Sequence, residues 1–139
     1  MLPSADEILE RYGFGRAHHR ILHFVNRDPG MTIAAILDLL QITKQSLSRV
    51  LRQLVDENFV VLQQGDEDRR QRRLYPTTKG RELTLELSRA QARRIDAALA
   101  ASRMEEVPWV GDFLFEMGGD RAATRDWFAR KGIVKTERR

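Results

Sequence analysis

The sequence predicts a mainly α-helical α+β fold, a winged helix-turn-helix with further helices at both ends. Three observations predict this fold. Between residues 32 and 56, two apolar stripes at helical spacing follow one another across a tight turn. A β-rich segment, residues 59–62, then leads through a cluster of arginines to a returning segment at residues 74–75. A longer helical pattern begins near Thr78. This order of elements is typical of a winged helix-turn-helix.

Length and composition limit the possible classes of protein. A chain of 139 residues fits one domain, residues 1–139, with a core that buries about two-thirds of the unfolded surface. The net charge of +4, from 24 Lys+Arg and 20 Asp+Glu, favours polyanionic partners without establishing one. The absence of cysteine excludes disulfides and thiolate metal sites. No signal peptide and no apolar run of ~20 residues is present, so we expect a cytoplasmic protein without a membrane partner.

The N-terminal part predicts two helices. Residues 4–11 form a short amphipathic segment that carries Ile8 and Leu9. Such a short helix is unstable alone, so we expect it to lean on a second chain or on the C-terminal part. A longer helix follows and ends at residues 28–30, and its apolar positions are Phe14, Ala17, Ile21, Leu22 and Val25.

Two threonines mark the starts of the next two helices. Thr32 is the expected N-cap of the first, with Met31 and Ile36 placed to pack across the cap. Thr43 repeats this arrangement for the second helix. Because the turn between them is so short, the two helices must cross steeply, as in a helix-turn-helix.

The exposed side of the second helix carries donors, hydroxyls and cations, and no carboxylate precedes Asp56. A solvated basic face is the simpler reading, and a helix that reads the major groove is the alternative that we favour. In that role Gln45, Ser46 and Arg49 face base edges, whereas Ser48 and Arg52 bind phosphates. The full set of predicted contacts is Thr43, Lys44, Gln45, Ser46, Ser48, Arg49 and Arg52, with Gln53 also on this side.

The segment between the two β-rich stretches predicts a charged wing. Its expected DNA contacts are Asp68, Arg69, Arg70, Arg72 and Arg73. Arginines at a wing tip suit the backbone or a narrow minor groove, where the negative potential attracts guanidinium groups. A carboxylate near DNA needs a reason, and we expect Asp68 to pair with an arginine and fix the wing. The alternative is a disordered charged loop that keeps the protein soluble.

These residues resemble the MarR family of bacterial transcription regulators. The resemblance is carried by residues 43–51, by Asp68-Arg69-Arg70, and by the pattern Leu74-x-x-Thr77-x-x-Gly80, and it covers about residues 14–99. It implies a homodimer that binds double-stranded DNA at a pseudo-palindromic operator, usually as a repressor and often released by a small-molecule effector. By position, Ser46, Ser48 and Arg49 match the family's recognition helix, and residues 68–70 match its wing.

Two residues depart from the family pattern. Gln41 stands in the turn where relatives often have glycine, so it is expected to adopt a positive φ at a cost of order 1 kcal/mol, unless the turn has another shape. Pro76 stands where relatives have leucine. Because proline donates no ladder hydrogen bond, we expect it to end the returning strand at a sheet edge.

The ends of the chain predict a dimerisation region. The helix from about Thr78 to Ala101, with Thr77 as its expected N-cap, is apolar on more than one face. Two further helices follow, the second capped by Asp120. We therefore divide the chain into a winged core, residues 14–80, and dimerisation helices, residues 1–12 and 81–134. A monomer whose helices fold back on the wing domain is the alternative. The predicted interface residues are Ile8, Leu9, Leu85, Ile95, Leu99, Phe113, Leu114 and Trp127.

Metal sensing, catalysis and protein binding are the alternatives to DNA binding. His19 and His23 have the i, i+4 spacing of metal ligands, but further ligands are not evident, so a metal sensor with this fold is an alternative and no metal or cofactor is predicted. No nucleophile elbow, phosphate loop or carboxylate pair indicates an enzyme. A winged helix that binds another protein also fits. The candidate effector contacts, proposed only for their expected proximity, are Tyr12, Arg16, His18, Trp109 and Phe113.

Overall fold

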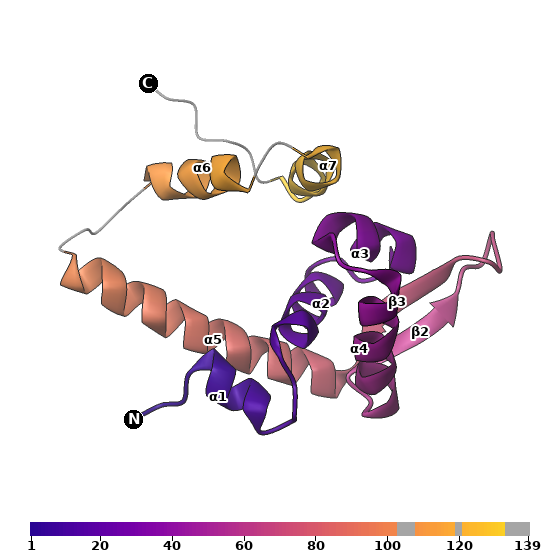
Figure 1. Ribbon diagram of the computed structural model, residues 1–139, viewed down its shortest axis with the longest axis horizontal. Coiled ribbons are helices and arrows are strands. Elements are labelled where there is room, and N and C mark those ends of the chain that lie inside the picture. Colours follow the sequence, from indigo (N-terminus) through magenta and orange to yellow (C-terminus); the bar gives the residue numbers. More distant parts are fainter. Residues whose placement is uncertain (103–107, 119–120, 133–139) are drawn as a thin grey trace. The chain divides into compact units, whose positions relative to one another are not determined.

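The computed structural model describes residues 1–102, 108–118 and 121–132, and the chain divides into two compact units, residues 1–94 and 95–139. The described part is mostly helical with a three-stranded antiparallel sheet, which confirms the predicted fold class (Figure 1). No helix in the described ranges combines the length and the apolar character that crossing a membrane requires. The first unit contains α1 (Ala5–Glu10), α2 (Arg16–Arg27), β1 (Met31–Thr32), α3 (Ile33–Leu40), α4 (Lys44–Asp56), β2 (Val60–Gln64), β3 (Arg72–Pro76) and most of α5 (Thr78–Ala101).

The short helix α1 is stabilised by its cap and by α5. Ser4 and Glu7 form a capping box, in which each side chain accepts a hydrogen bond from the other residue's backbone N–H, at 3.2 and 2.9 Å. The helix lies alongside α5, where Arg93 donates to the carbonyl of Pro3 at 3.2 Å (Figure 1). The expectation that α1 needs support from elsewhere is therefore confirmed within one chain.

Ile8 and Leu9 are core residues of the single chain. Their side chains are 0% and 2% exposed, because the apolar side of α1 is already covered. We predicted both at a dimer interface. That assignment needs correction, since residues with so little free surface cannot supply direct contact area to a partner without a rearrangement of α1.

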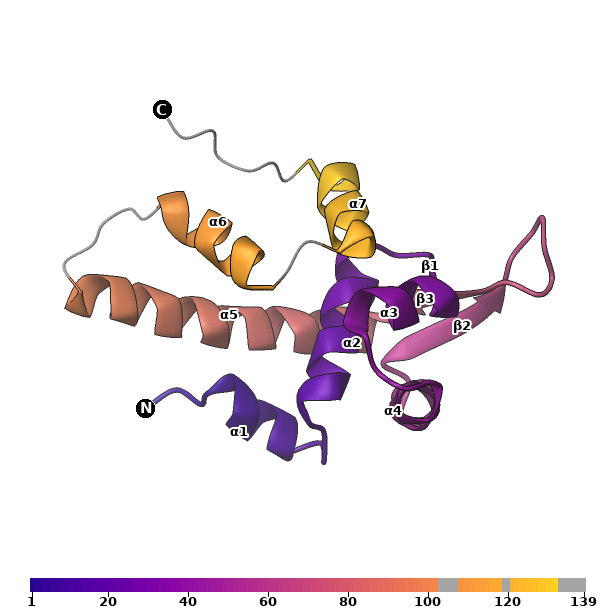
Figure 2. The same ribbon diagram turned by 45° about the horizontal axis from the view of Figure 1, so that its top comes forward.

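The two helices α3 and α4 form the predicted helix-turn-helix. Figure 2 looks along α4 and shows α3 crossing it steeply. Both predicted caps are present: Thr32 Oγ1 accepts from Ala35 N and Thr43 Oγ1 accepts from Ser46 N, each at 3.1 Å. Gln41 ends α3 with φ 53°, the positive value expected from its place in the turn. The buried faces of the two helices are made by Ile36, Leu39, Leu40, Leu47, Val50, Leu51 and Leu54.

The sheet has the order β1-β3-β2, and the sequence did not predict β1. Met31 and Thr32 pair with Leu74 and Arg73, so Thr32 is at once a strand residue and the N-cap of α3. Two residues carry no alternating pattern, which is why the strand could not be recognised. β3 ends at Pro76, as predicted, but it is the central strand rather than an edge. The pairing of β1 with β3 ends at Leu74, so β1 does not pair with Pro76.

The junction between the wing and α5 is held by close backbone contacts. Thr77 Oγ1 accepts from Gly80 N at 3.0 Å, which makes Thr77 the predicted cap of α5, and it donates to the Asn58 carbonyl at 2.6 Å. The backbone N–H of Thr77 donates to the carbonyl of Phe59 at 3.2 Å. A Cβ on Gly80 would overlap that same carbonyl oxygen, so the chain passes here only because residue 80 is glycine.

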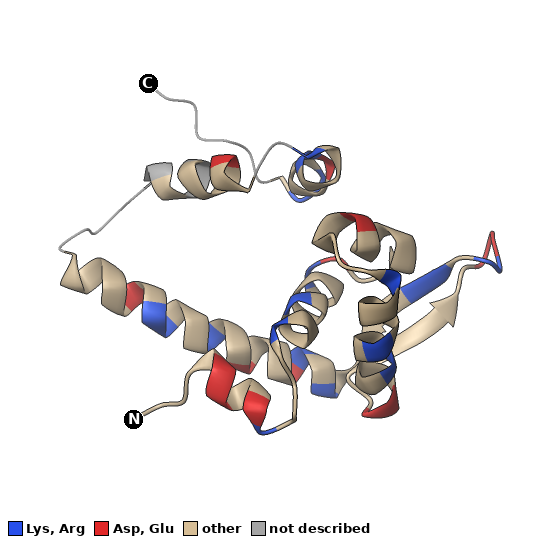
Figure 3. Ribbon diagram, viewed as in Figure 1, with Lys and Arg blue, Asp and Glu red and all other residues tan. Residues whose placement is uncertain are grey.

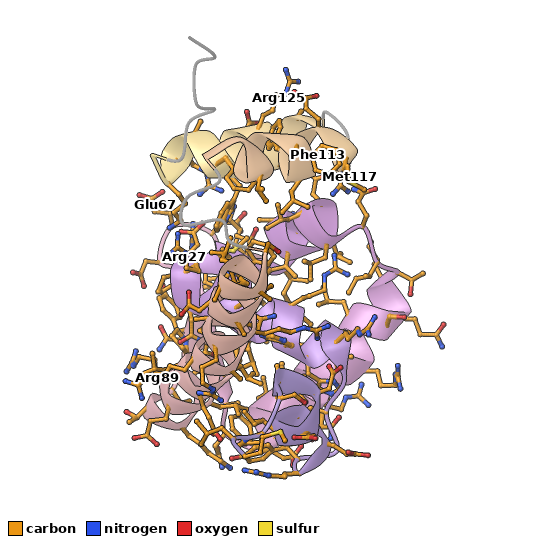
Figure 4. The ribbon with its side chains drawn as sticks, turned by 90° about the vertical axis from the view of Figure 1, so that its left-hand side faces the viewer. Arg27, Glu67, Arg89, Phe113, Met117 and Arg125 are labelled. Atoms are coloured by element: carbon orange, nitrogen blue, oxygen red, sulfur yellow. The ribbon has the colours of Figure 1, made fainter. Side chains whose placement is uncertain are left out.

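The second unit contains the end of α5, then α6 (Pro108–Met117) and α7 (Ala122–Arg130). Arg121 is the N-cap of α7; the predicted cap, Asp120, lies outside the described residues. Phe128 contacts Phe115 and Trp127 edge-on, at centroid distances of 5.6 and 5.4 Å. Trp127, another predicted interface residue, is buried in the single chain. In contrast, Phe113 and Met117 project from α6 and are exposed (Figure 4).

Candidate nucleic-acid interface

The outer face of α4 is cationic and exposed. The buried stripe of α4 faces α2 and the sheet, so the polar positions between the apolar ones point outward. Figure 3 shows the basic positions along α4 and at the start of β3. Inside the part of the chain that the structure describes, no hydrogen bond or ion pair engages the side chains of these exposed residues: Lys44, Gln45, Ser48, Arg49 and Arg52.

Three of the polar residues of this segment are engaged internally. Ser46 is half-buried, and its hydroxyl accepts from Thr43 Oγ1 at 3.0 Å while its N–H donates to the same atom. Gln53 is also half-buried, and its Oε1 lies 2.7 Å from His18 Nε2. Thr43 therefore caps the helix with Ser46 as its hydrogen-bond partner, and Gln53 faces inward rather than outward as predicted.

The turn that precedes α4 is fixed from α2. Arg20 Nη2 donates to the carbonyl of Leu40 at 3.1 Å, at the end of α3, where backbone carbonyls lack helical partners. Gln41 Nε2 donates to the carbonyl of Asp38 at 2.8 Å. Both side chains satisfy carbonyls of the last turn of α3, so the end of α3, where the turn to α4 begins, is anchored.

The wing loop, residues 65–71, closes on itself through backbone hydrogen bonds. Gly65 N donates to the Gln71 carbonyl at 2.8 Å, and Gln71 N donates to the Asp68 carbonyl at 3.0 Å. The carboxylate of Asp68 accepts from the backbone N–H of Arg70 at 2.9 Å. We expected a guanidinium partner, and that expectation is wrong: Asp68 does fix the wing, but through an Asx-type turn. The exposed cations of the wing are Arg69, Arg70 and Arg72.

Arg73 holds the base of the wing. Its Nη1 donates to the carbonyl of Gly30 at 2.9 Å and its Nη2 to Gln71 Oε1 at 3.2 Å. Gly30 in turn donates to the Leu74 carbonyl at 2.7 Å, with φ 92°. We predicted Arg73 as a DNA contact together with its neighbours. The structure gives its guanidinium a structural role between β1 and the loop of the wing.

The predicted effector residues belong to both units of the chain. Tyr12, Phe14, His18 and Phe59 form an aromatic cluster, in which Phe14 stacks on His18 at 4.6 Å and meets Phe59 edge-on at 5.2 Å. Tyr12 stacks on Phe14 at 5.7 Å. Within this cluster Tyr12 and His18 are packing residues, while Arg16 is exposed near it. Phe113 belongs to the second unit, and the side chain of Trp109 lies outside the described residues.

The remaining histidines are half-buried on α2. Burial lowers the pKa of His19, against a smaller opposite effect of Asp6. Burial also lowers the pKa of His23, and the positive charges of Arg27 and His19 add to the decrease. Low pKa values keep both rings neutral near pH 7. Among the described residues, no three histidine or acidic side chains lie together in a way that would hold a metal ion.

Two comparisons of the sequence with known proteins both find transcription regulators. The sequence model of the MarR family matches residues 12–71. The HTH-type transcriptional regulator PetP of Rhodobacter capsulatus is 47% identical over 102 residues, 73% of this chain and 61% of that protein. The chain belongs to the MarR family. It spans less than two-thirds of the length of this curated relative.

Two solved MarR-family structures have the same fold. A MarR transcriptional regulator from Methanosarcina mazei Go1 is 26% identical, with a TM-score of 0.66, and the match covers 82% of this chain and 78% of that one. A MarR family transcriptional regulator from Listeria monocytogenes, complexed with 26mer DNA, is 18% identical, with a TM-score of 0.72 and coverage of 96% and 88%. The winged helix-turn-helix is therefore the fold of this chain, and its family is one of transcription regulators rather than enzymes.

The structure also explains the signature that this chain shares with the MarR family. Asp68 forms the turn of the wing loop, Thr77 caps α5 and bonds the segment after α4, and Gly80 permits the contact with Phe59. Sequence reasoning missed the contact between His18 and Gln53. The two residues are 35 positions apart, so no local pattern could have indicated it.

Proposed function

We propose that this protein is a sequence-specific regulator of transcription that binds double-stranded DNA, with α4 as the recognition helix and the loop 65–71 as the wing. One observation carries the proposal: six cations on α4, on this loop and at the start of β3 are exposed and lack internal partners in the described part of the chain. They are Lys44, Arg49 and Arg52 on α4, Arg69 and Arg70 on the loop, and Arg72 at the start of β3.

The chemistry of these residues matches a duplex. Arg49 lies near the middle of the exposed face of α4, and a guanidinium can donate two parallel hydrogen bonds to a guanine edge. Lys44 and Gln45 lie in the first turn of α4, the end of a recognition helix that points into the major groove. The bound DNA of the Listeria monocytogenes relative supports the same partner for this chain. Arg69 and Arg70 on the wing then contact the backbone or the minor groove.

We further propose that the protein acts as a homodimer. Leu85 and Ile95 on α5, and Phe113, Leu114 and Met117 on α6, are large apolar side chains that are at least half exposed in the single chain. Apolar residues at such exposure favour contact with a partner. Two recognition helices related by a two-fold axis would enter successive major grooves about 34 Å apart, which requires a near-palindromic site.

A repressor mode and a small effector follow from the family resemblance and complete the proposal. Tyr12, Arg16, His18, Trp109 and Phe113 stay predicted effector contacts. Of these, Tyr12 and Arg16 are exposed in the first unit, whereas His18 is half-buried in the aromatic cluster. Release of bound DNA by a panel of aromatic acids is the corresponding measurement.

The experiment that tests DNA binding measures its salt dependence. Affinity for a duplex selected by the protein from a randomised library is determined by fluorescence anisotropy at several salt concentrations. Binding through phosphate contacts must fall steeply with salt, because condensed counterions are released. If the protein selects no duplex, or if its affinity is independent of salt, the basic faces of α4 and the wing have another partner, such as a protein.

A further inference from the structure

We propose that His18 is a positioning residue for the recognition helix: through its hydrogen bond to Gln53 it sets the rotation of α4, and so controls sequence preference more than overall affinity for DNA. The inference rests on the proposed function. His18 lies on α2, outside both DNA-binding elements, and its half-buried ring stacks on Phe14.

The imidazole of His18 is constrained on three sides. Its ring stacks on Phe14 with centroids 4.6 Å apart and an interplanar angle of 8°. Its Nδ1 accepts from the backbone N–H of Gly15 at 3.0 Å, and its Nε2 lies 2.7 Å from Gln53 Oε1. Because Nδ1 is an acceptor, the neutral ring carries its proton on Nε2, which donates to Gln53. Phe14 therefore holds the position of the ring, and Gly15 defines its tautomer.

Gln53 connects this ring to the residues that face DNA. It lies four residues after Arg49, and residues four apart are neighbours on one side of a helix. The apolar contacts of α4 hold the helix against the core, but they carry no preferred bond direction. A hydrogen bond has a preferred length and angle, and the bond to His18 therefore adds a directional constraint on the rotation of α4.

The wing does not depend on this hydrogen bond. Its loop is closed by Asp68, Gly65 and Gln71, and its base is held by Arg73 on the carbonyl of Gly30. Contacts to phosphates from the wing should therefore survive a small rotation of α4. Contacts to base edges should be lost on such a rotation, because they need donor and acceptor to meet within about 2.7–3.2 Å.

Two substitutions distinguish the roles of the two ring nitrogens of His18. In His18→Asn, the amide oxygen can replace Nδ1 as the acceptor for Gly15 N–H, but the side chain is too short to reach Gln53. In His18→Gln, the amide nitrogen can replace Nε2 as the donor to Gln53, whereas the acceptor for Gly15 is lost. The two variants are close in size and polarity, so each is the control for the other.

The measurement compares two duplexes of equal length by fluorescence anisotropy: one selected by the wild-type protein from a randomised library, and one with that sequence scrambled. For His18→Asn we expect about tenfold weaker binding to the selected duplex, the loss of one good base contact. Affinity for the scrambled duplex should stay unchanged, and His18→Gln should retain the wild-type preference. Thermal unfolding establishes that both variants are folded.

Three outcomes would contradict the positioning role: an unchanged preference in His18→Asn, an equal loss for both duplexes, or a preference lost equally in both variants. If the wild-type protein itself selects no duplex, the proposed function fails instead. Gln53→Leu provides a second test. It should reduce the preference as His18→Asn does, and the double variant should show no further reduction, since both remove the same contact. Additive losses would show that the two residues act separately.

Discussion

At the scale of single residues, Gly80 determines whether the wing can meet α5. Two opposite effects act in Gly80→Ala. Alanine raises helix propensity by about 1 kcal/mol, but its Cβ would overlap the backbone carbonyl of Phe59, which cannot rotate away. We expect the overlap to prevail and to lower the free energy of unfolding by about 1–3 kcal/mol in urea titrations. Thr78→Ala, in the same first turn but exposed, is the control and should change stability little.

His19 and His23 predict how stability responds to acid. Burial lowers the pKa of both rings in the folded protein below the usual value of 6.5, so the unfolded chain binds protons more readily. Their contribution to stability is present above pH 6.5 and is lost as the pH falls through the folded values. Urea unfolding should show lower stability at pH 5.5 than at pH 7.5. His23→Gln should reduce this difference, and an unchanged difference would assign it to other groups.

The residue scale is also where sequence reasoning was least complete. The positive φ of Gln41 was predictable from the family resemblance, because relatives often have glycine at this place in the turn. The internal contacts of Gln53 and Arg73 were not predictable. A polar side chain on the outer face of an isolated helix or strand looks free, and only tertiary structure brings the partner: His18 for Gln53 and the Gly30 carbonyl for Arg73.

At the scale of elements, α4 and the wing should contribute to binding in different ways. Arg49→Ala should weaken binding to the selected duplex by about 1–3 kcal/mol and relax its base preference, if Arg49 makes a bidentate base contact. Arg70→Ala should weaken selected and scrambled duplexes alike and reduce the salt slope by about one unit. Anisotropy titrations of both duplexes over a salt series distinguish the two. Equal losses of preference in both variants would refute this division of roles.

Elements with strong local signals were predicted well. The caps Thr32, Thr43 and Thr77 all accept the expected backbone N–H, so the starts of α3, α4 and α5 agree with the sequence. β1 was missed because two residues have no periodicity of their own and pair only through β3. The edge assignment of Pro76 failed for the same reason, since without β1 the strand β3 would be at an edge.

At the scale of the whole molecule, burial divides the predicted interface into two groups. Ile8, Leu9 and Trp127 are covered within one chain, whereas Leu85 and Phe113 are 50% and 55% exposed. Hydrophobic spacing alone could not make this distinction, because it marks a residue as apolar without showing which chain covers it. The exposed group keeps its predicted role as dimer contacts, and the division of the chain into core and dimerisation helices stays a prediction.

Phe113→Ala tests that role. Because the Phe113 ring is already half in solvent, its removal should leave the thermal stability of a single chain nearly unchanged. If the ring is buried between two subunits, the same change removes apolar contact area and should raise the dimer dissociation constant by at least about tenfold, or 1.4 kcal/mol. Sedimentation velocity over a range of concentrations measures this shift. Val61→Ala is the control: Val61 is 40% exposed on β2 and is not one of the proposed interface residues, so its loss should not alter the sedimentation profile. If neither variant changes the profile, α6 is not part of the dimer contact, and the exposed residues Leu85 and Ile95 of α5 would be the next positions to substitute.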